Sequence, residues 1–380
     1  MKKIFFLLLA TVLFVSCGKE GVTVTVENTN DYDRSAEMVE LSVKDIEAKV
    51  KLAEGQAYVV TNSKGEVVPS QVTFDGKLIF QSGVAANAKE TYTVSAGEAQ
   101  EFAAKTYGRF IQERKDDFAW ENDRVAFRVY GPALVATDGP SNGIDIWYKR
   151  TSDLIVDKWY AKELAGEGSY HDDHGEGLDD YKVGRSLGAG AMAPYVDGKL
   201  WLNGNYATHE VLENGPLRST FRFTYADLDV NGKTVKETRT FSIDAGSQFS
   251  KVVQEYAGAD AMEVAAGIVK RPAGDSIISN QDYLIYAEPT TPKVSGMYVA
   301  LVFPAGIKNS VVDTYTVDAK VNGGEYKHAL AVADYTADAP IVYYTGYGWE
   351  KFGFATLADF ETYAKNFSAS LKQPLKITIQ

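Results

Sequence analysis

Residues 205–246 read NYATHEVLENGPLRSTFRFTYADLDVNGKTVKETRTFSIDAG, and they decide the fold class. Runs of strand length, rich in Thr, Val and Phe, alternate with Asn-Gly and other turn residues. Val230-Asn231-Gly232-Lys233 is a strong hairpin signal, because Asn and Gly tolerate the positive φ that a tight turn needs. The stretch therefore predicts successive antiparallel strands, and similar runs continue to residue 349.

The same pattern extends to both ends and suggests two β domains. Residues 22–102 predict a small N-terminal β-sandwich, since VTVTVEN alternates and Asp75-Gly76 separates two apolar runs. Residues 103–380 predict a large antiparallel sandwich that carries the site. Within it, only residues 355–372 have helical periodicity, which predicts one C-terminal helix before a final strand. The predicted fold class is all-β.

The N-terminus predicts a lipoprotein signal peptide over residues 1–17. Lys2 and Lys3 precede the apolar run IFFLLLATVLFV, which is too short to span a membrane and ends close to Cys17. Cys17 is the only cysteine, so we expect it to be lipidated and the mature chain to lack a catalytic thiol. This predicts a lipid anchor in the periplasm or at the outer-membrane surface of a Gram-negative bacterium. A plain secretory signal is the alternative.

Composition narrows the possible partners. A net charge of −12 disfavours nucleic acid, whose phosphates would be repelled, and leaves the lipid as the expected membrane contact. No glycine-rich nucleotide motif follows a predicted strand. The 23 tyrosines offer flat faces with a hydroxyl, which suit half-buried strands and equally suit stacking against sugar rings.

The polar stretch Tyr170–Gly190, YHDDHGEGLDDYKVGRSLGAG, differs from the strands around it. It contains two of the four histidines together with carboxylates, tyrosines, an arginine and five glycines. Proton-transferring side chains are concentrated here with little apolar residue between them. We interpret it as a functional loop carried by the β scaffold.

This stretch and three other segments, NDRVAFRVYGPA, NGIDIWYKR and YGWEKFG, resemble a family of bacterial lipoproteins known as domain of unknown function 4861. The resemblance covers nearly all of the mature chain. It implies a carbohydrate-active protein of glycan-degradation gene clusters, often those for pectin and other uronic-acid polymers. It also implies the supersandwich fold of galactose mutarotases and several polysaccharide lyases, although the acid and base of the mutarotases are not reproduced here.

The residue types in the stretch fit β-elimination from a uronate. That reaction needs a group to neutralise the carboxylate, a base for the C5 proton and a donor for the leaving oxygen, and Arg, His and Tyr fill these roles. The candidate catalytic residues are Tyr170, His171, His174, Tyr181 and Arg185. The candidate substrate contacts are Arg124, Arg128, Arg150, His209, Arg218, Arg222 and Trp147. The alternative is that the histidines only hold the loop together.

A divalent cation, calcium or zinc, is a second possibility. His171 and His174 form an HxxH pair beside the candidate ligands Asp172, Asp173 and Glu176. Glycines at 175 and 177 disfavour the helical turn that would bring the two histidines together. A solvated acidic loop explains the same residues.

Three further functions stay open at this point. Hydrolysis would use paired carboxylates, with Glu176 and either Asp180 or Glu210 as candidates. Mutarotase-like or epimerase-like isomerisation would pair His171 or His209 with Glu350. Non-catalytic capture of an oligosaccharide would stack sugar rings on tryptophans, namely Trp147, Trp159, Trp201 or Trp349. We expect a carbohydrate-active lipoprotein acting on uronic-acid-containing glycan fragments by lyase-like elimination or by hydrolysis.

Overall fold

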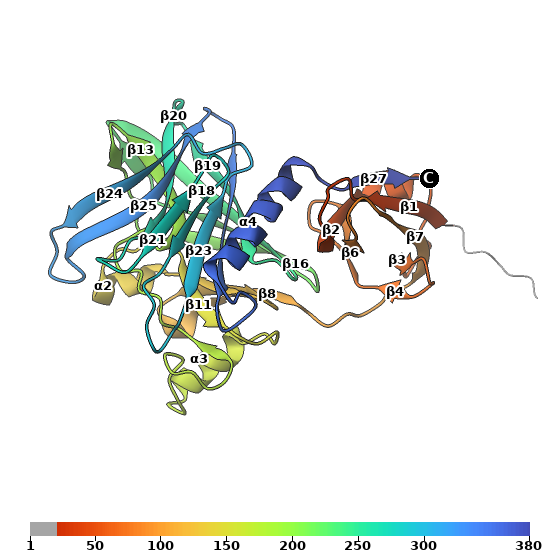
Figure 1. Cartoon of the computed structure of the whole chain (residues 1–380), viewed down its shortest axis with the longest axis horizontal. Helices are drawn as coiled ribbons and strands as arrows, with labels where there is room; N and C mark the ends of the chain where they lie inside the picture. Colours follow the sequence, from red (N-terminus) through yellow and green to blue (C-terminus); the bar gives the residue numbers. More distant parts are fainter. Residues whose placement is uncertain (1–20) are drawn as a thin grey trace, which may run out of the picture.

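The computed structural model describes residues 21–380 and has a small and a large β lobe, joined by the segment that leads into β8 and by the end of α4 (Figure 1). The signal peptide and the lipidation predicted at Cys17 lie outside the described residues. In residues 21–380, no helix is both long and apolar enough to cross a membrane. The all-β prediction is confirmed, because antiparallel sheets form both lobes.

The small lobe packs two sheets over one apolar core. One sheet has the order β27-β1-β7-β3-β4 and the other has the order β2-β6-β5. The bounds of these strands are β1 Gly21–Glu27, β2 Arg34–Ser42, β3 Gln56–Asn62, β4 Val67–Val68, β5 Ser70–Val72, β6 Lys77–Val84, β7 Lys89–Glu98 and β27 Lys376–Ile379. Helix α1, Val43–Glu47, follows β2. The alternation in VTVTVEN sends Val22, Val24 and Val26 into this core.

The final strand belongs to the small lobe, whereas the sequence placed it with residues 103–380. β27 pairs antiparallel with β1, and Val24 lies opposite Ile379. Ile377 and Ile379 pack against the core of the small lobe. A short strand carries no signal for the sheet edge it will join, so the closure of the first sheet by the end of the chain was not predictable.

The large lobe has one nine-stranded sheet and two five-stranded sheets. The first has the order β15-β16-β18-β19-β26-β23-β22-β21, with β17 paired to β18. Its strands are β15 Thr208–Asn214, β16 Arg218–Thr224, β17 Leu228–Val230, β18 Lys233–Asp244, β19 Phe249–Ala257, β21 Ser276–Ser279, β22 Tyr283–Ala287, β23 Met297–Val302 and β26 Ile341–Trp349. The predicted hairpin is present, since Val230 pairs with Lys233 and both Asn231 and Gly232 have positive φ.

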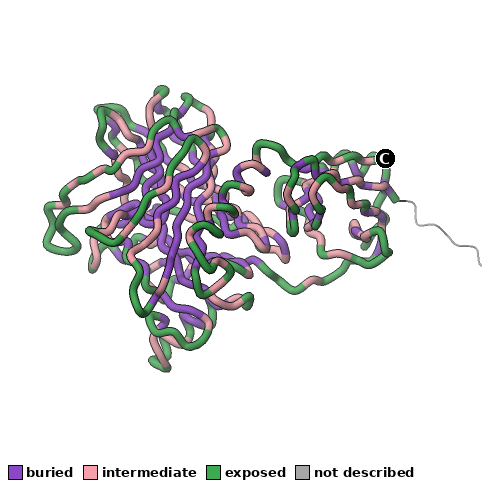
Figure 2. Tube along the Cα trace, viewed as in Figure 1, coloured by how far each residue is buried: buried purple, intermediate pink, exposed green. Residues whose placement is uncertain are grey.

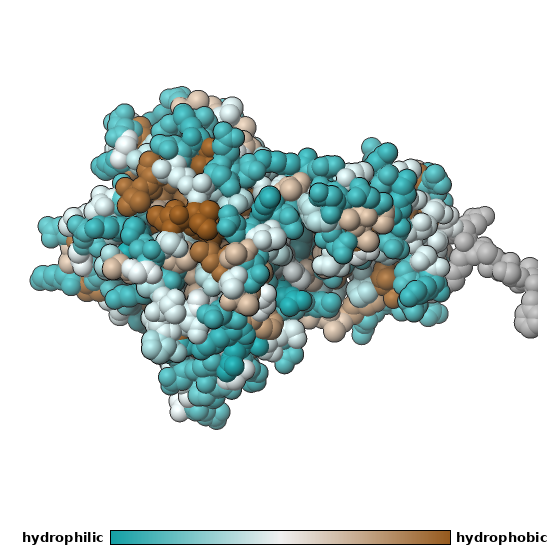
Figure 3. All heavy atoms as spheres, viewed as in Figure 1, coloured by the Kyte–Doolittle hydropathy of each residue, from teal (hydrophilic) through white to brown (hydrophobic). Residues whose placement is uncertain are grey.

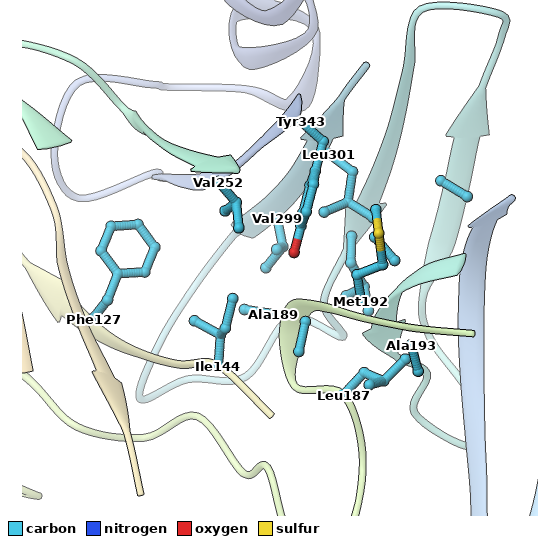
Figure 4. Packing of buried hydrophobic residues seen from close by; sticks show 14 of the residues in the cluster. Phe127, Ile144, Leu187, Ala189, Met192, Ala193, Val252, Val299, Leu301 and Tyr343 are labelled. Atoms are coloured by element: carbon cyan, nitrogen blue, oxygen red, sulfur yellow. The ribbon is translucent and has the colours of Figure 1, made fainter. Parts of the chain in front are cut away.

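The two five-stranded sheets have the orders β12-β11-β10-β9-β8 and β14-β13-β20-β25-β24. Their strands are β8 Thr106–Ile111, β9 Asp117–Asn122, β10 Ala126–Val129, β11 Asp145–Lys149, β12 Gly177–Leu178, β13 Ala189–Val196, β14 Lys199–Leu200, β20 Met262–Val269, β24 Asn309–Val317 and β25 Gly324–Tyr335. Side chains of all three sheets meet in one buried cluster, including Phe127, Met192, Val252 and Leu301 (Figure 4). Buried residues fill the centre of this lobe (Figure 2).

Helices cover outer faces of these sheets. The predicted C-terminal helix is α4, Leu357–Lys372, which begins at a capping box between Thr356 and Asp359 and packs Phe360 against the nine-stranded sheet. A further helix, α3, Val156–Leu164, covers the sheet of β8 to β12. The short helices are η1 Gln112–Arg114, η2 Pro132–Leu134 and α2 Val135–Asp138. Most of the surface visible in Figure 3 is hydrophilic, including the part where the lobes meet.

Candidate functional site

The stretch Tyr170–Gly190 divides into two halves with different surroundings. The second half, residues 181–190, enters the core of the large lobe, where Leu187 and Ala189 are buried (Figure 4). The Tyr181 hydroxyl donates a hydrogen bond to the Gly188 carbonyl at 3.0 Å, inside the protein. Tyr181, predicted to be catalytic, is therefore a core residue without access to a substrate.

The first half, residues 170–180, contributes β12 to the edge of the sheet of β8 to β12, and Arg128 binds it on the outer face of that sheet. Alternation along β10 sends Phe127 into the core and Arg128 to the outer face. The Arg128 guanidinium donates hydrogen bonds to Asp145, its cross-strand neighbour in β11, and to Asp179 at 2.8 Å. The arginine thus connects two strands to the polar stretch.

Three aromatic rings surround the buried Arg128. Its guanidinium carbon lies 5.1 Å from the Tyr130 ring centroid, 5.2 Å from that of Trp147 and 5.8 Å from that of Tyr170. Trp147 and Tyr170 also stack on each other at 5.2 Å. Tyr170 and Trp147 are both buried, so they shape the site without presenting a free face to a sugar.

Asp145 is the most perturbed carboxyl group of this cluster. Burial raises the pKa of Asp145 to about 7; Arg128 opposes this shift and the charge of Asp179 adds to it. The half-buried Tyr130 donates a hydrogen bond to Asp145 at 3.0 Å. Because Asp145 shares Arg128 with a second carboxylate, that of Asp179, it can hold or release a proton near neutral pH.

His171 is the exposed end of the cluster. Its Nδ1 lies 2.8 Å from the main-chain oxygen of Asp179 and 3.8 Å from Oδ2 of the same residue. A carbonyl oxygen can only accept, so Nδ1 carries the proton and Nε2 is the free acceptor. The His171 side chain is 57% exposed, which leaves Nε2 open to solvent.

His174 has different surroundings and does not converge with His171. Its Nε2 lies 3.1 Å from the main-chain oxygen of Ser169, and within residues 21–380 no carboxylate lies in ion-pair range of its ring. The residue lines a cavity of about 280 Å³ beside α3. The other cavity-lining residues are Lys158, Trp159, Lys162, Ser169, Tyr170, Asp172, Gly175, Glu176 and Gly177.

Two predicted arginines, Arg185 in the stretch and Arg150 before it, already contact other parts of the protein. The Arg185 guanidinium packs against Gly139, where a Cβ atom would lie 2.5 Å from Nη1, and the main-chain oxygen of Arg185 accepts from Tyr315. Arg150 donates to Asp173 at 3.0 Å. Among the predicted substrate contacts, only Arg128 and Trp147 lie in the cluster, and both are buried.

The other predicted contacts are spread over the large lobe. Arg124 precedes β10 and lies over the Phe352 ring, so it is not on the strand that carries Arg128. His209 stacks on Phe110 at 4.3 Å, and burial lowers its pKa. Arg222 lies 3.6 Å from Glu210 in an exposed pair. The fourth, Arg218, is bound to Asp244 and Glu40 where the lobes meet.

The predicted metal ligands are not assembled into a site. Asp173 accepts from Arg150 and from the amides of Gly175 and Gly177. Glu176 pairs with Lys158 at 2.6 Å, and Asp172 is exposed. No group of three or more His, Cys, Asp or Glu residues in the described part of the chain is placed to hold a metal ion. The three residues therefore have protein partners or face solvent, and the metal interpretation stays a prediction.

The carboxylates proposed for hydrolysis each have a cation beside them. Asp180 pairs with Lys293 at 2.6 Å, in addition to the pairs already described for Glu176 and Glu210. Glu350, proposed for isomerisation, accepts from the Gly296 amide at 2.7 Å, while His209 lies against Phe110. These carboxylates thus have local structural partners.

The tryptophans proposed for sugar stacking are mostly covered. Trp349 is buried and its indole donates to the Val294 oxygen at 2.6 Å. Trp159 is 7% exposed and lines the cavity beside α3. The Lys199 ammonium lies over the ring of the half-buried Trp201, 4.5 Å from the ring centroid.

Sequence reasoning missed Tyr130, Asp145 and Asp179 as members of the site. Tyr130 and Asp145 lie in ordinary strand text, RVY and IDIW, and become neighbours only because β10 pairs with β11. A lone aspartate between isoleucines was the available signal, since a charge on a buried strand needs a partner.

Comparisons with known proteins agree with this β-rich architecture. "Uncharacterized protein P7" of Formosa agariphila is 32% identical over 400 residues, covering 99% of this chain and 98% of P7. The structure of a protein in the glycosyl hydrolase family 38 from Enterococcus faecalis matches with a TM-score of 0.52 at 8% identity, which shows a shared fold. That match covers 95% of this chain and 47% of the other, so the chain spans about half of that protein's length. The family model described as Domain of unknown function (DUF4861) matches residues 26–377, and the chain belongs to this family.

Proposed function

We propose that this protein is carbohydrate-active and removes a proton from uronic-acid-containing glycan fragments in a lyase-like β-elimination, with His171 as the base. One observation carries the proposal. The Asp179 carbonyl holds Nδ1 of His171 at 2.8 Å while Nε2 faces solvent, and Asp179 is itself bound to the buried Arg128. An imidazole fixed on one side and open on the other is prepared to accept a proton.

The reaction requires a neutralised substrate carboxylate, a base and a proton donor. His171 Nε2 takes the C5 proton, the C–H electron pair forms the C4–C5 double bond, and the C4–O bond to the leaving sugar breaks. The leaving oxygen takes a proton from solvent water, and the His171 imidazolium then returns its proton to solvent. The products are an unsaturated uronate and a new hydroxyl group.

The contacts of the carboxylates favour elimination over hydrolysis. Paired-carboxylate hydrolysis needs one free acid and one free carboxylate across the scissile bond. The three candidates Glu176, Asp180 and Glu210 each pair with a cation instead. Elimination from a uronate needs one base, one proton donor and a neutralised substrate carboxylate, so it does not depend on a pair of free protein carboxylates.

The fold supports a carbohydrate context. A solved protein that shares the fold is described as a protein in the glycosyl hydrolase family 38. At 8% identity this likeness concerns the fold, so the sugar and the bond rest on the chemistry of the His171 site.

The two histidines provide a matched test. The purified protein is incubated with uronate oligosaccharides, and the ultraviolet absorbance of the unsaturated product is followed. We expect His171→Asn to lower turnover by about a hundredfold or more, in line with the loss of a general base, and His174→Asn to retain it. New reducing ends without the absorbance, or full turnover by His171→Asn, would contradict the proposal.

Capture of an oligosaccharide without turnover is the second candidate function. It is favoured by the cavity of about 280 Å³ beside α3, where Lys158, Lys162 and His174 meet the edge of Trp159. Binding of the same oligosaccharides with no product, lost in Lys162→Met, would support capture over elimination.

We also propose that lipid on Cys17 anchors the protein in the periplasm or at the outer-membrane surface. The basic start, the short apolar run and the position of the only cysteine support this location. Metabolic labelling with a palmitate analogue should mark the wild-type protein and not Cys17→Ala. Labelling of both would exclude this anchor.

A further inference from the structure

A second hollow, of about 510 Å³, lies where the small lobe meets the outer face of the nine-stranded sheet and α4. We call it the lobe cleft. Its lining includes Glu40 and Lys77 from the small lobe, Lys251 from β19 and Tyr363 from α4. None of its lining residues belongs to the Arg128 cluster, so it is a separate site.

The floor of the lobe cleft is a row of polar side chains on four neighbouring strands. Thr220 of β16 lies opposite Ser242 of β18, Ser242 opposite Lys251 of β19, and Lys251 opposite Tyr344 of β26. All four line the cleft. With strands about 4.8 Å apart, the row extends over about 14 Å.

Among the residues that the structure describes, Lys251 is the cation of the cleft that has no ion-pair partner. Arg34 pairs with Glu37 at 2.5 Å, Arg218 with Asp244 at 2.5 Å, and Lys77 with Glu40 at 2.6 Å.

Within residues 21–380, no carboxylate lies in ion-pair range of the Lys251 ammonium, and Glu40 and Asp244 act on it only from farther away. Burial lowers the pKa of Lys251, and the positive charges of Arg218 and Lys77 lower it further. An anionic ligand would supply the missing countercharge.

The walls of the cleft are fixed by contacts between the lobes and by a contact within the large lobe. The Gln71 side chain donates to the Arg218 main-chain oxygen at 2.9 Å and accepts from the amides of Leu217 and Arg218. On the opposite side, Tyr344 packs edge-on against Phe367 of α4 at 5.1 Å. The cleft is therefore preformed and combines hydroxyl groups, one open cation and aromatic surface, as sugar sites commonly do.

We propose that the lobe cleft binds a saccharide with a single carboxylate, in which Lys251 pairs with that carboxylate and Ser242 and Tyr344 bind ring hydroxyls. The assignment of a uronate rests on the proposed function. Six acidic residues line the cleft against four basic ones, so a polyuronate would be repelled. The acidic residues are Asp33, Glu37, Glu40, Asp75, Glu213 and Asp244.

Calorimetric titration of the whole protein tests this site. The ligands are a disaccharide with one uronate and its neutral counterpart, and the background is His171→Asn, so that turnover does not change the ligand. We expect Lys251→Met to weaken binding of the acidic disaccharide about tenfold or more, as for the loss of a charged hydrogen bond, and to leave neutral binding unchanged. Lys251→Arg should retain most of the affinity.

The control is Lys233→Met, which removes an exposed lysine at the far end of β18, where it pairs with Asp260. It should bind both disaccharides like the parent protein. If Lys251→Met fails to fold, Lys251→Gln replaces it with the same expected loss. Unchanged affinity for the acidic disaccharide, or an equal loss for both disaccharides, would overturn the site. Failure of the proposed function would appear instead as normal turnover by His171→Asn.

Discussion

The two halves of the stretch Tyr170–Gly190 both contain titratable residues and have different fates. Residues 171–175 of the first half, which include His171 and His174, are exposed at the surface of the large lobe. Residues 181–190 run into the core, where the Leu187 amide donates to the buried His328 and burial lowers the pKa of that histidine to about 4. The difference shows that a concentration of titratable residues marks a site only where the fold leaves it accessible.

A glycine substitution in the second half should have the largest effect. Gly188 has a φ of +63°, and a Cβ atom there would lie 2.1 Å from the Ile144 oxygen. Gly188→Val should therefore lower the free energy of unfolding by about 4 kcal/mol or more, or prevent folding. Gly175→Ala, in the first half, meets nothing within 4 Å and should cost about 1 kcal/mol from its positive φ alone. Urea denaturation measures the free energy of unfolding of both variants. Equal losses would contradict the difference that we infer between the two halves.

Breaking the link between the first half and the sheet should cause the next largest loss in the free energy of unfolding. Arg128→Met leaves Asp145 and Asp179 buried without their cation, which should cost about 3–5 kcal/mol. Arg222→Met removes an exposed pair and should change the free energy of unfolding by less than about 1 kcal/mol. Thermal and urea denaturation measure both. A small loss in Arg128→Met would mean that the first half does not depend on this arginine.

The pH dependence of stability tests the protonation of Asp145. Burial raises its pKa in the folded protein to about 7, from an ordinary value of 3.8. Between these values the folded state holds a proton that the unfolded state has lost, so the contribution to stability is present at low pH and is lost as pH rises to about 7.

Wild-type protein should therefore lose more of its free energy of unfolding between pH 5 and pH 7 than Asp145→Asn does. Urea titrations of both proteins at the two pH values measure the difference. Identical changes in the two proteins would show that Asp145 does not titrate in this range. Burial also raises the pKa of Asp117 to about 6, which adds a change of the same sign to both proteins.

The smallest effects on stability are expected from the two exposed histidines. His171→Ala and His174→Ala each remove one side-chain contact with a main-chain oxygen at the surface. Each should change the free energy of unfolding by less than about 1 kcal/mol, measured by urea denaturation. A loss of several kcal/mol in either variant would mean that the first half is structural, like the second.

Much of the fold was predictable because it depends on local patterns. The turn at Asn231-Gly232, the alternation in residues 22–28 and the spacing of Leu357 and Phe360 each follow from neighbours in the sequence. The short helix α3 was not predicted. Its burial of Val156, Trp159 and Tyr160 depends on the sheet beneath it, because nine residues provide little helical periodicity.

The candidate site was predictable in part. The sequence located His171 in a polar loop, and it also pointed to Arg128 and Tyr170, which the structure brings beside it. The sequence predicted that Arg128 binds substrate, whereas in the structure this arginine pairs with two aspartates. Nothing in the sequence indicates that the Arg128 of one strand faces the Asp145 of another.

The sequence by itself determined the all-β class, the positions of hairpins and the C-terminal helix, and the concentration of titratable residues in one stretch. These features depend on residues close together in the chain. Tertiary structure alone decided that β27 closes the small lobe, that half of the polar stretch is buried, and that Lys251 has no ion-pair partner within residues 21–380. These outcomes depend on strand pairing and burial between distant segments, and local composition does not encode which segments will meet.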